Sequence, residues 1–247
     1  MAKGTGLSTL FFVRGYDLSG DVGSIGTLST PSGKLDVSGI NVAGHERIYA
    51  KHDGMLTFNT FFNDAVDQEH LILRAKNAGA DTIISWFYGS TLGNPAYAIE
   101  AKQVDYPWTR GPDGSLEATI NAQANGRGGD WCKELTAGKR TDTAATNGTG
   151  VNNSAATAFG LAAYLHVFSF TGTSMTAAIQ ESQNDGGADP YAAVTGGAFA
   201  AASAVGSQHI VTTSLTQSIE QWLRLVTTGT FNPCTFAVCA TRFPYQL

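Results

Sequence analysis

The sequence predicts a mainly β protein made of two β units, and three observations lead to this prediction. In residues 115–124 apolar and polar side chains alternate strictly, which is the period of a half-buried strand. Charged residues are only 14% of the chain, against roughly 25% in ordinary soluble domains, while glycine, with 29 of 247 residues, supplies many turns. Strand candidates also recur at even spacing through the second half of the chain, which is typical of a small β-sandwich or jelly roll.

The first unit begins with a strand candidate at 9–14, followed by a glycine-rich stretch at 20–39. The residues that interrupt this stretch are Gly23, Gly26, Pro31 and Gly33. We therefore expect a long irregular loop there, with a short strand near 35–37. Loops longer than about 15 residues are usually functional or ordered by assembly. Further strand candidates follow at 54–62 and 82–88.

One helix is expected between these two strands. Asn63 and Asp64 are suitable N-cap residues, and Asn77 with Gly79 ends the helical pattern. Acidic residues near its start and basic residues near its end complement the helix dipole: Asp67, Glu69, Arg74 and Lys76. Its apolar face is narrow and consists of Val66, His70 and Leu73. The helix is thus predicted to flank a sheet.

The element that the sequence predicts most clearly is a long β-hairpin at 96–124. Its second strand, 115–124, carries one apolar face made of Leu116, Ala118, Ile120, Ala122 and Ala124. The alternating residues form a mild polar face made of Ser115, Glu117, Thr119, Asn121 and Gln123. A strand of this length needs a long partner, and we expect 96–106 to supply it. The residues between them favour a chain reversal: Pro107, Gly111, Pro112, Asp113 and Gly114.

The boundary between the two units is expected in a segment rich in Thr, Ala, Asn and Gly. Few side chains at 137–158 could anchor a core, so we place the first unit at 1–140, a linker at 141–158 and the second unit at 159–247. The strand candidates of the second unit are 162–170, 174–180, 191–195, 209–213, 219–227 and 235–243.

The composition argues against several classes of protein. A net charge of −5 leaves no basic surface for stable binding to nucleic acid. The three cysteines, Cys132, Cys234 and Cys239, cannot all pair within one chain, so we expect free, mostly buried thiols in a reducing compartment. Residues 1–10 lack the apolar core of a signal peptide, and the apolar-rich run 159–170 is too short to span a bilayer. We expect folding in a cytoplasm and no membrane partner.

No constellation of residues indicates catalysis or metal binding. The histidines form no pair with metal-ligand spacing, and Cys132 beside Lys133 has no histidine nearby in sequence. Residues 184–189 lack the alternating ligands of a calcium loop, and the glycines at 126–129 lack the Lys-Ser/Thr pair of a phosphate loop. We therefore expect no enzyme, no metal and no cofactor.

Aromatic residues gather near the predicted strands, and we interpret four of them as inter-subunit anchors: Trp86, Tyr88, Tyr106 and Trp108. A stacking platform for a sugar or a base is the alternative. Aromatic residues in such positions more often belong to a strand core or anchor an interface.

Several segments resemble the major tail tube proteins of long flexible-tailed bacteriophages. In the first unit these segments are 46–48, 53–54, 61–64, 93–96, 101–106 and 135–143. In the second unit, 163–169, 171–173 and 222–227 resemble the added C-terminal module of the same proteins. The resemblance covers nearly the whole chain, with one departure: Asp130 stands where the family often has glycine.

This resemblance implies a structural virion protein of the phage tail, assembled in the host cytoplasm as stacked hexameric rings around a conduit for the genome. It implies a tail-tube β-sandwich with one flanking helix, long inner-wall hairpins and a small C-terminal β-sandwich. The expected partners are other copies, the tape-measure protein, tail terminator and tail-tip proteins, and passing double-stranded DNA. The residues expected to line the lumen are Glu100, Lys102, Glu117, Thr119, Asn121 and Gln123. The residues expected in a ring-stacking loop at 20–39 are Asp21, Ser24, Pro31 and Lys34.

Two alternatives stay open on sequence alone. The chain could be a two-module β protein that decorates a capsid or binds cell-surface carbohydrate. A hydrolase using carboxylates such as Glu46 and Asp53 is the third possibility.

Overall fold

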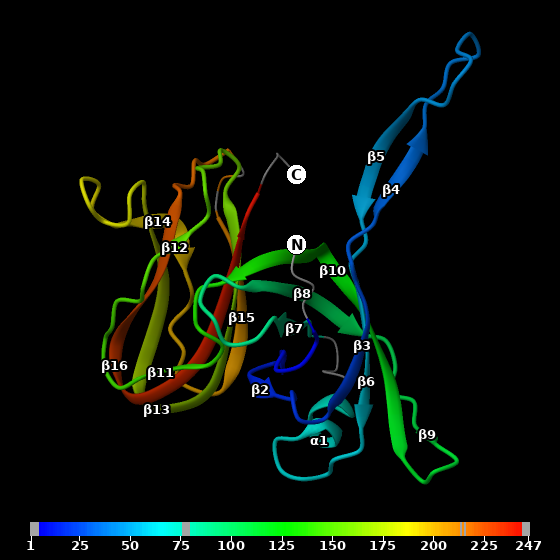
Figure 1. The fold of residues 1–247 in the computed structure, drawn as a ribbon, viewed down its shortest axis with the longest axis horizontal. Coiled ribbons are helices and arrows are strands. Elements are labelled where there is room, and N and C mark those ends of the chain that lie inside the picture. Colours follow the sequence, from blue (N-terminus) through cyan, green and yellow to red (C-terminus); the bar gives the residue numbers. More distant parts are fainter. Residues whose placement is uncertain (1–4, 76–79, 213, 215, 244–247) are drawn as a thin grey trace.

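The protein is mainly β in the computed structural model, which describes residues 5–75, 80–212, 214 and 216–243. Two bodies lie side by side, and a narrow arm projects from one of them (Figure 1). The first half of the chain forms β1 (Leu10–Val13), β2 (Tyr16–Asp17), β3 (Val22–Ser29), β4 (Ser32–Asp36), β5 (Arg47–His52), β6 (Met55–Phe61), α1 (Glu69–Leu73), β7 (Thr82–Phe87), β8 (Pro95–Gln103) and β9 (Thr109–Arg110). The long strand β10 (Leu116–Glu134) leads to β11 (Arg140–Asp142), β12 (Val151–Asn152), β13 (Leu161–Ser182), β14 (Ala192–Ala198), β15 (Gly206–Val211) and β16 (Trp222–Arg242).

The first unit is an antiparallel sheet rolled around an apolar core. Its strands follow the order β3-β6-β10-β8-β7-β1-β2. Phe11 on β1 and Phe58 on β6 lie near opposite ends of this order, yet their ring centroids are 4.6 Å apart. The sheet therefore curls until its two ends face each other across the core. Helix α1 adds Ile72 and Leu73 to the same core.

The alternation predicted for residues 115–124 is confirmed from Glu117 to Gln123, whereas Leu116, which was expected on the apolar face, is exposed. Ala118, Ile120 and Ala122 are buried in the rolled core, and the polar residues between them face outward. The predicted pairing is wrong for most of this stretch, because Glu117 to Gln123 pair with β6, and β8 joins β10 only from Ala122 onward. The connection between β8 and β10 is long and contains β9, so no tight turn fixes a hairpin register there.

The reversal itself lies where the sequence places it. The Gly111 N–H donates to the Ser115 carbonyl at 2.8 Å, and Gly114 adopts a φ of +94°, which favours glycine. The Asp113 carboxylate accepts hydrogen bonds from the Ser115 N–H and hydroxyl, at 3.0 and 2.8 Å. This turn closes β9 onto the start of β10.

The expected helix is real but shorter and starts later. Its N-cap residue is Gln68, which makes no side-chain capping bond. Asn63, the expected cap, instead donates to the Asp21 carboxylate at 2.8 Å, which ties the chain before the helix to the chain before β3. Lys76, Asn77 and Gly79, which the sequence pattern places at the helix end, lie outside the described residues.

The irregular loop expected at 20–39 is wrong, because this segment forms β3 and β4; the short strand expected near 35–37 overlaps the end of β4. Gly23 and Gly26 lie so close to β6 that a Cβ atom there would be 2.6 Å from the side chains of Phe61 and Thr57. The register of β3 on β6 also shifts twice along this stretch. These glycines mark irregular strand pairing at close approach rather than a loop.

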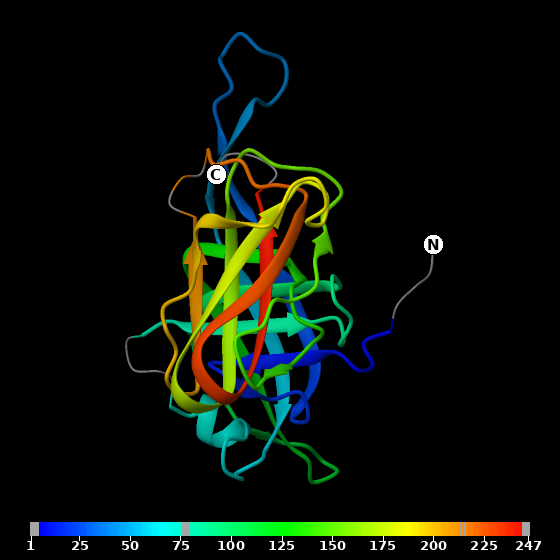
Figure 2. The same cartoon turned by 90° about the vertical axis from the view of Figure 1, so that its left-hand side faces the viewer.

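The second unit consists mainly of two very long strands that pair and fold back on themselves. The strands predicted at 162–170 and 174–180 are both parts of β13, and those predicted at 219–227 and 235–243 fall largely within β16. Gly172 and Gly229, with φ of +139° and +117°, lie at the bend, where backbone atoms of the paired strand leave no room for a Cβ. The two halves of the bent pair enclose a second core, as the U-shaped ribbons show (Figures 1 and 2).

The prediction of a linker at 141–158 is also wrong. β11 and β12 pair with β16, and Thr157 bridges to Ile219, so this segment packs along the second unit. Lys133 and Glu134, at the end of β10, pair with Ala240 and Cys239 of β16. The two units therefore share one continuous sheet. A third apolar cluster, which includes Phe12, Phe87, Tyr164 and Cys239, fills the junction between them.

His166 crosses this junction as a fully buried, neutral side chain. The Gly15 N–H donates to its Nδ1 at 3.1 Å, so the proton lies on Nε2 and is donated to the Ser85 hydroxyl at 2.9 Å. Burial lowers the pKa of His166 to about 3. The imidazole thus joins β13 to β7 and to the turn after β1.

Replacing Ile120 with alanine tests the inward face of β10. The Ile120 side chain is fully buried, so the cavity left behind should lower the free energy of unfolding by about 2–5 kcal/mol. Gln123→Ala, on the exposed face of the same strand, is the matched control and should change it by no more than about 0.5 kcal/mol. Urea unfolding followed by circular dichroism measures both, and equal losses at the two positions would contradict the assignment of faces.

Glu134→Gln tests the buried carboxyl where the two units join. Burial raises the pKa of Glu134 from 4.5 to about 8, and its Oε2 accepts the Gly138 N–H at 3.1 Å. Because the folded-state pKa lies above the unfolded value, stability is complete below the unfolded pKa and falls as pH rises through the folded one. The wild type should lose on the order of a few kcal/mol across that window relative to the variant, which keeps the Gly138 bond. Glu117→Gln, at an exposed position, is the control and should follow the wild type. If the free energy of unfolding of Glu134→Gln changed with pH in parallel with that of the wild type, the assignment of this raised pKa would be refuted.

Candidate assembly surfaces

A wall of uncharged polar side chains covers the outer face of β3, β6 and β10. We call it the polar wall, and its central members are Ser24, Thr27, Thr57, Asn59, Thr119, Asn121 and Gln123. The Thr119 hydroxyl donates to Asn59 Oδ1 at 2.8 Å, and Asn59 Nδ2 donates to the Ser24 hydroxyl at 3.1 Å. Hydrogen bonds thus connect the three strands across this face and hold the side chains in place.

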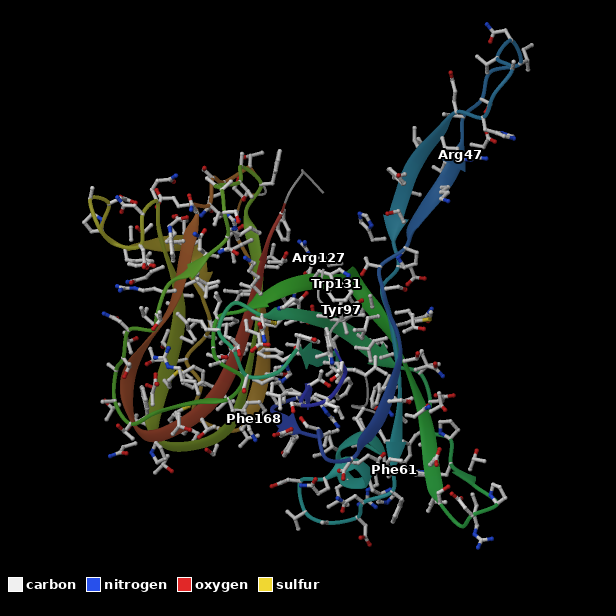
Figure 3. The ribbon with its side chains drawn as sticks, in the orientation of Figure 1. Arg47, Phe61, Tyr97, Arg127, Trp131 and Phe168 are labelled. Atoms are coloured by element: carbon white, nitrogen blue, oxygen red, sulfur yellow. The ribbon has the colours of Figure 1, made fainter. Side chains whose placement is uncertain are left out.

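Charges occur only at the margins of the polar wall. Glu117 lies beside the exposed Phe61 at the end far from the arm (Figure 3). Lys102 lies opposite Gln123 at the other margin, and its ammonium is 2.8 Å from the Asp81 carboxylate. Hydrogen bonds from Lys102 and Asn125 lower the pKa of Asp81. Between these margins the wall offers hydroxyls and amides, with the exposed Met55 beside Gln123.

Five of the six residues expected to line a lumen therefore share one face, and Glu100 does not lie among them. Glu100 Oε2 is 3.1 Å from Nδ1 of His209 on β15, in the second unit. β8 continues past the wall toward the junction of the two units, so Ala96 and Ala98 are covered there and Glu100 is partly covered. The second unit and the polar wall lie on opposite sides of the rolled sheet (Figure 1).

β3 ends the polar wall with an edge that pairs with no other strand among the described residues. Along this edge runs an apolar cavity of about 680 Å³, which we call the seam groove. Its apolar lining consists of Leu7, Phe11, Val22, Ile25, Leu28, Trp86 and Trp131. Trp131 is 57% exposed and meets Trp86 and Tyr97 edge-on. An open strand edge beside an apolar groove is a surface suited to another chain.

The arm, formed by β4 and β5, is a separate two-stranded sheet that stands away from the body (Figure 1). Its exposed apolar residues are Leu35, Val37, Ile40, Val42, Ile48 and Tyr49. A two-stranded hairpin is marginally stable in water, and a concentration of exposed apolar side chains marks an interaction surface. The sequence suggested a loop here, and only the structure shows a projecting hairpin.

The four residues expected in a ring-stacking loop are scattered. Asp21 is buried and accepts hydrogen bonds from Asn63 and from the Glu69 N–H, at 2.8 and 3.1 Å. Ser24 belongs to the polar wall, Pro31 lies at the base of the arm, and Lys34 lies on β4. These four residues lie apart because the segment forms two strands, β3 in the body and β4 in the arm, instead of one loop.

The expected aromatic anchors form two separate groups. Trp86 lies 6.0 Å from Tyr88 and 6.3 Å from Trp131, between ring centroids. Tyr106 lies 5.3 Å from Trp108 on another part of the unit. Trp86, Tyr106 and Trp108 all pack against the rolled core. Sequence reasoning missed Trp131, because the register shift in the glycine-rich stretch just before it places it opposite Tyr97 on β8, where it stays exposed beside the seam groove.

A buried polar cluster holds α1 against β6. Glu69 is fully buried and accepts hydrogen bonds from the hydroxyls of Thr60 and Tyr106, at 3.2 and 3.3 Å. Tyr106 also lies 2.9 Å from His70 Nδ1. Burial raises the pKa of Glu69 to about 7. With its carboxyl enclosed and its partners satisfied, this cluster serves packing rather than contact with a substrate.

The remaining chemical candidates are separated or enclosed. Glu46 precedes β5 and Asp53 follows it, so the two carboxylates lie at opposite ends of one strand. All three cysteines are buried and unpaired, and burial raises the pKa of the Cys132 thiol, the opposite of an activated nucleophile. Within the described ranges, no group of three or more His, Cys, Asp or Glu side chains is placed to hold a metal ion. No helix there is long and apolar enough to cross a membrane.

In the second unit, the ring of Tyr191 is covered and offers no open face for stacking on a sugar. The guanidinium of Arg224 covers the ring of Tyr191 at 4.1 Å, and the Tyr191 hydroxyl donates to Asp185 at 2.7 Å. The loop at 184–189 is a turn, in which Asn184 Oδ1 accepts the Asp189 N–H at 3.0 Å. Its polar groups are used to close the turn.

No protein-family model matches this sequence, and no curated protein matches it. Among solved structures, the chain is similar to the Dit protein of phage SPP1, described as a paradigm of the hub adsorption apparatus in phages that infect Gram-positive bacteria. That alignment has 13% identity and a TM-score of 0.33, and it covers 95% of this chain and 99% of the other. The chain is also similar to a chain of the phage P2 baseplate in its activated conformation with Ca, at 9% identity and a TM-score of 0.37, covering 96% and 99%. With TM-scores below 0.5, these likenesses assign no activity or partner to the chain.

Proposed function

We propose that this chain is a structural protein of a bacteriophage tail, and that its copies assemble as stacked hexameric rings into the tail tube. The observation that carries the proposal is the arm, whose apolar side chains are exposed on a hairpin that points away from its own body. Its own chain leaves these side chains exposed, so a second copy is the natural cover. The resemblance of many segments to tail tube proteins supports the same role.

Lateral joining of copies follows from the open edge of β3. An unpaired edge invites another strand, and a head-to-tail contact repeated around an axis closes a ring and removes the edges. The seam groove beside β3 gives an incoming chain apolar area to bury, including Trp131. In such a ring, the sheets of successive copies continue one another around the lumen.

In this proposal the polar wall lines the lumen and the second unit lies outside. The two lie on opposite sides of the rolled sheet, so a ring that turns one inward turns the other outward (Figures 1 and 2). A lumen of hydroxyls and amides, in which Lys102 at the margin is paired with Asp81, gives phosphates little cationic surface to bind, so DNA can slide through it. The lumen also holds the tape-measure protein before ejection, and the tube ends meet the terminator and tail-tip proteins. This role requires no catalysis and no cofactor.

The outer unit is proposed to brace neighbouring copies. It joins the first unit through the shared sheet of β10 and β16 and through the junction core, so it is held in one position. A part held in this way can transmit contact between neighbours along the outside of a tube.

The double variant Ile40→Ser, Tyr49→Ser tests the arm. Both side chains are among the most exposed apolar groups of the molecule, so the monomer should keep its fold, while assembly should be lost with the apolar contact. Size-exclusion chromatography with light scattering and negative-stain electron microscopy measure the outcome. Val205→Ser, an exposed apolar position on the second unit, is the control and should assemble as the wild type does. Tubes or rings of normal yield from the double variant would contradict the proposal.

Glu117→Arg with Asn121→Arg tests the polar wall. Two cations per copy on a lumen face should bind phosphate, so genome release should slow in low salt and recover as salt is raised, while tubes still assemble. The rate of DNA release from virions, followed by dye fluorescence, measures this. Asn121→Gln is the neutral control. If intact tubes of the double variant released DNA at the wild-type rate, the assignment of the polar wall to the lumen would be wrong.

A further inference from the structure

A glycine-rich interruption of β10 lies where the arm, the rolled sheet and the second unit meet. We call residues 126–129 the glycine bulge, because the register between β10 and β8 shifts between Ala124 and Gly129. Gly126 and Gly128 adopt φ values of +98° and +108°, which other residues rarely accept. The contacts that the bulge makes on its two sides indicate its role.

One side of the bulge holds the first leg of the arm. Thr30 lies between β3 and β4, and its hydroxyl accepts the Gly129 N–H at 3.0 Å and donates to the Gly129 carbonyl at 2.7 Å. The Tyr97 hydroxyl, from β8, donates to the carbonyl of Ser29 at 3.0 Å. A Cβ on Gly129 would lie 1.9 Å from the Tyr97 hydroxyl oxygen, so this clamp needs glycine there.

The second leg of the arm crosses the same bulge. Gly54, between β5 and β6, approaches so closely that a Cβ there would lie 2.5 Å from the Gly129 nitrogen. Its carbonyl accepts the Ala124 N–H at 2.8 Å. Both strands of the arm are therefore held at their base by contacts with the bulge, so the base of the hairpin is not a free hinge.

The other side of the bulge holds the second unit. Arg127 places its guanidinium 3.8 Å from the ring centroid of Phe243 and pairs with Asp130 at 3.2 Å. The Tyr164 hydroxyl, from β13, donates to Asp130 Oδ2 at 2.7 Å. Figure 3 shows Arg127, Tyr97 and Trp131 gathered at this crossing.

We propose that the glycine bulge sets the direction of the arm, with Thr30 and Tyr97 as positioning residues and the second unit as a brace on the opposite side. An arm fixed before contact loses less conformational freedom on docking and reaches the next copy at one angle. The consequence for ring geometry rests on the proposed function; the direction of the arm in a single copy does not.

Spin labels on an exposed arm residue and an exposed wall residue test the direction. Arg47→Cys and Gln123→Cys accept labels while the native cysteines are buried, and pulsed electron paramagnetic resonance on the full chain, diluted to monomers, gives the distance distribution. One narrow peak is expected. Thr30→Val and Tyr97→Phe, singly and together, should replace it with a broad distribution, and Tyr164→Phe should broaden it by loosening the brace.

The matched control is Ser32→Ala, which removes a bond between Ser32 and His52 inside the arm at 2.9 Å and leaves the bulge intact. Its distribution should stay narrow, and thermal melts should show that the body of each variant is folded. A narrow, unshifted peak in both the clamp variants and Tyr164→Phe would overturn the proposal. Broad distributions combined with normal rings would leave the bulge as the positioning element and refute instead the role of the arm in assembly.

Discussion

The packing of alternate β10 side chains into the rolled core fixes the outer surface of the first unit. Because Ala118, Ile120 and Ala122 are buried, the polar residues between them are forced to the outer face, where they form the wall. A shift of the β10 register by one residue would bury amides and hydroxyls without hydrogen-bond partners and would expose the apolar core. Both changes would destabilise the fold. The polar wall is thus a direct result of core packing and needs no separate device.

The same strand relates the parts of the molecule that carry different surfaces. The first half of β10 pairs with β6, its middle forms the glycine bulge under the arm, and its last residues pair with β16. A change in the bulge therefore reaches the arm and the second unit together. In the proposed ring, this arrangement gives every copy the same angle between its lumen face, its arm and its outer unit.

The sequence alone predicted what depends on local pattern, and missed what depends on irregular or long-range pairing. The alternation around Ile120 and the turn at Gly114 follow from side-chain period and backbone freedom, so both were predictable. The partner of the first half of β10 was not, because it is β6, a strand distant in the sequence, and no local pattern specifies such a long-range pairing. Gly23 suggested a loop although it marks close approach to β6, and the glycines of the bulge did not reveal the register shift that places Trp131 opposite Tyr97. The apolar arm could not be recognised, since its side chains resemble core until the structure shows them exposed.

Cryo-electron microscopy of the purified full-length protein at high concentration tests the account most directly. The account predicts rings or tubes in which β3, β6 and β10 face the lumen, the second unit lies outside, and each arm rests on a neighbouring copy. Monomers at every concentration, or an assembly with the polar wall on its outer surface, would contradict it.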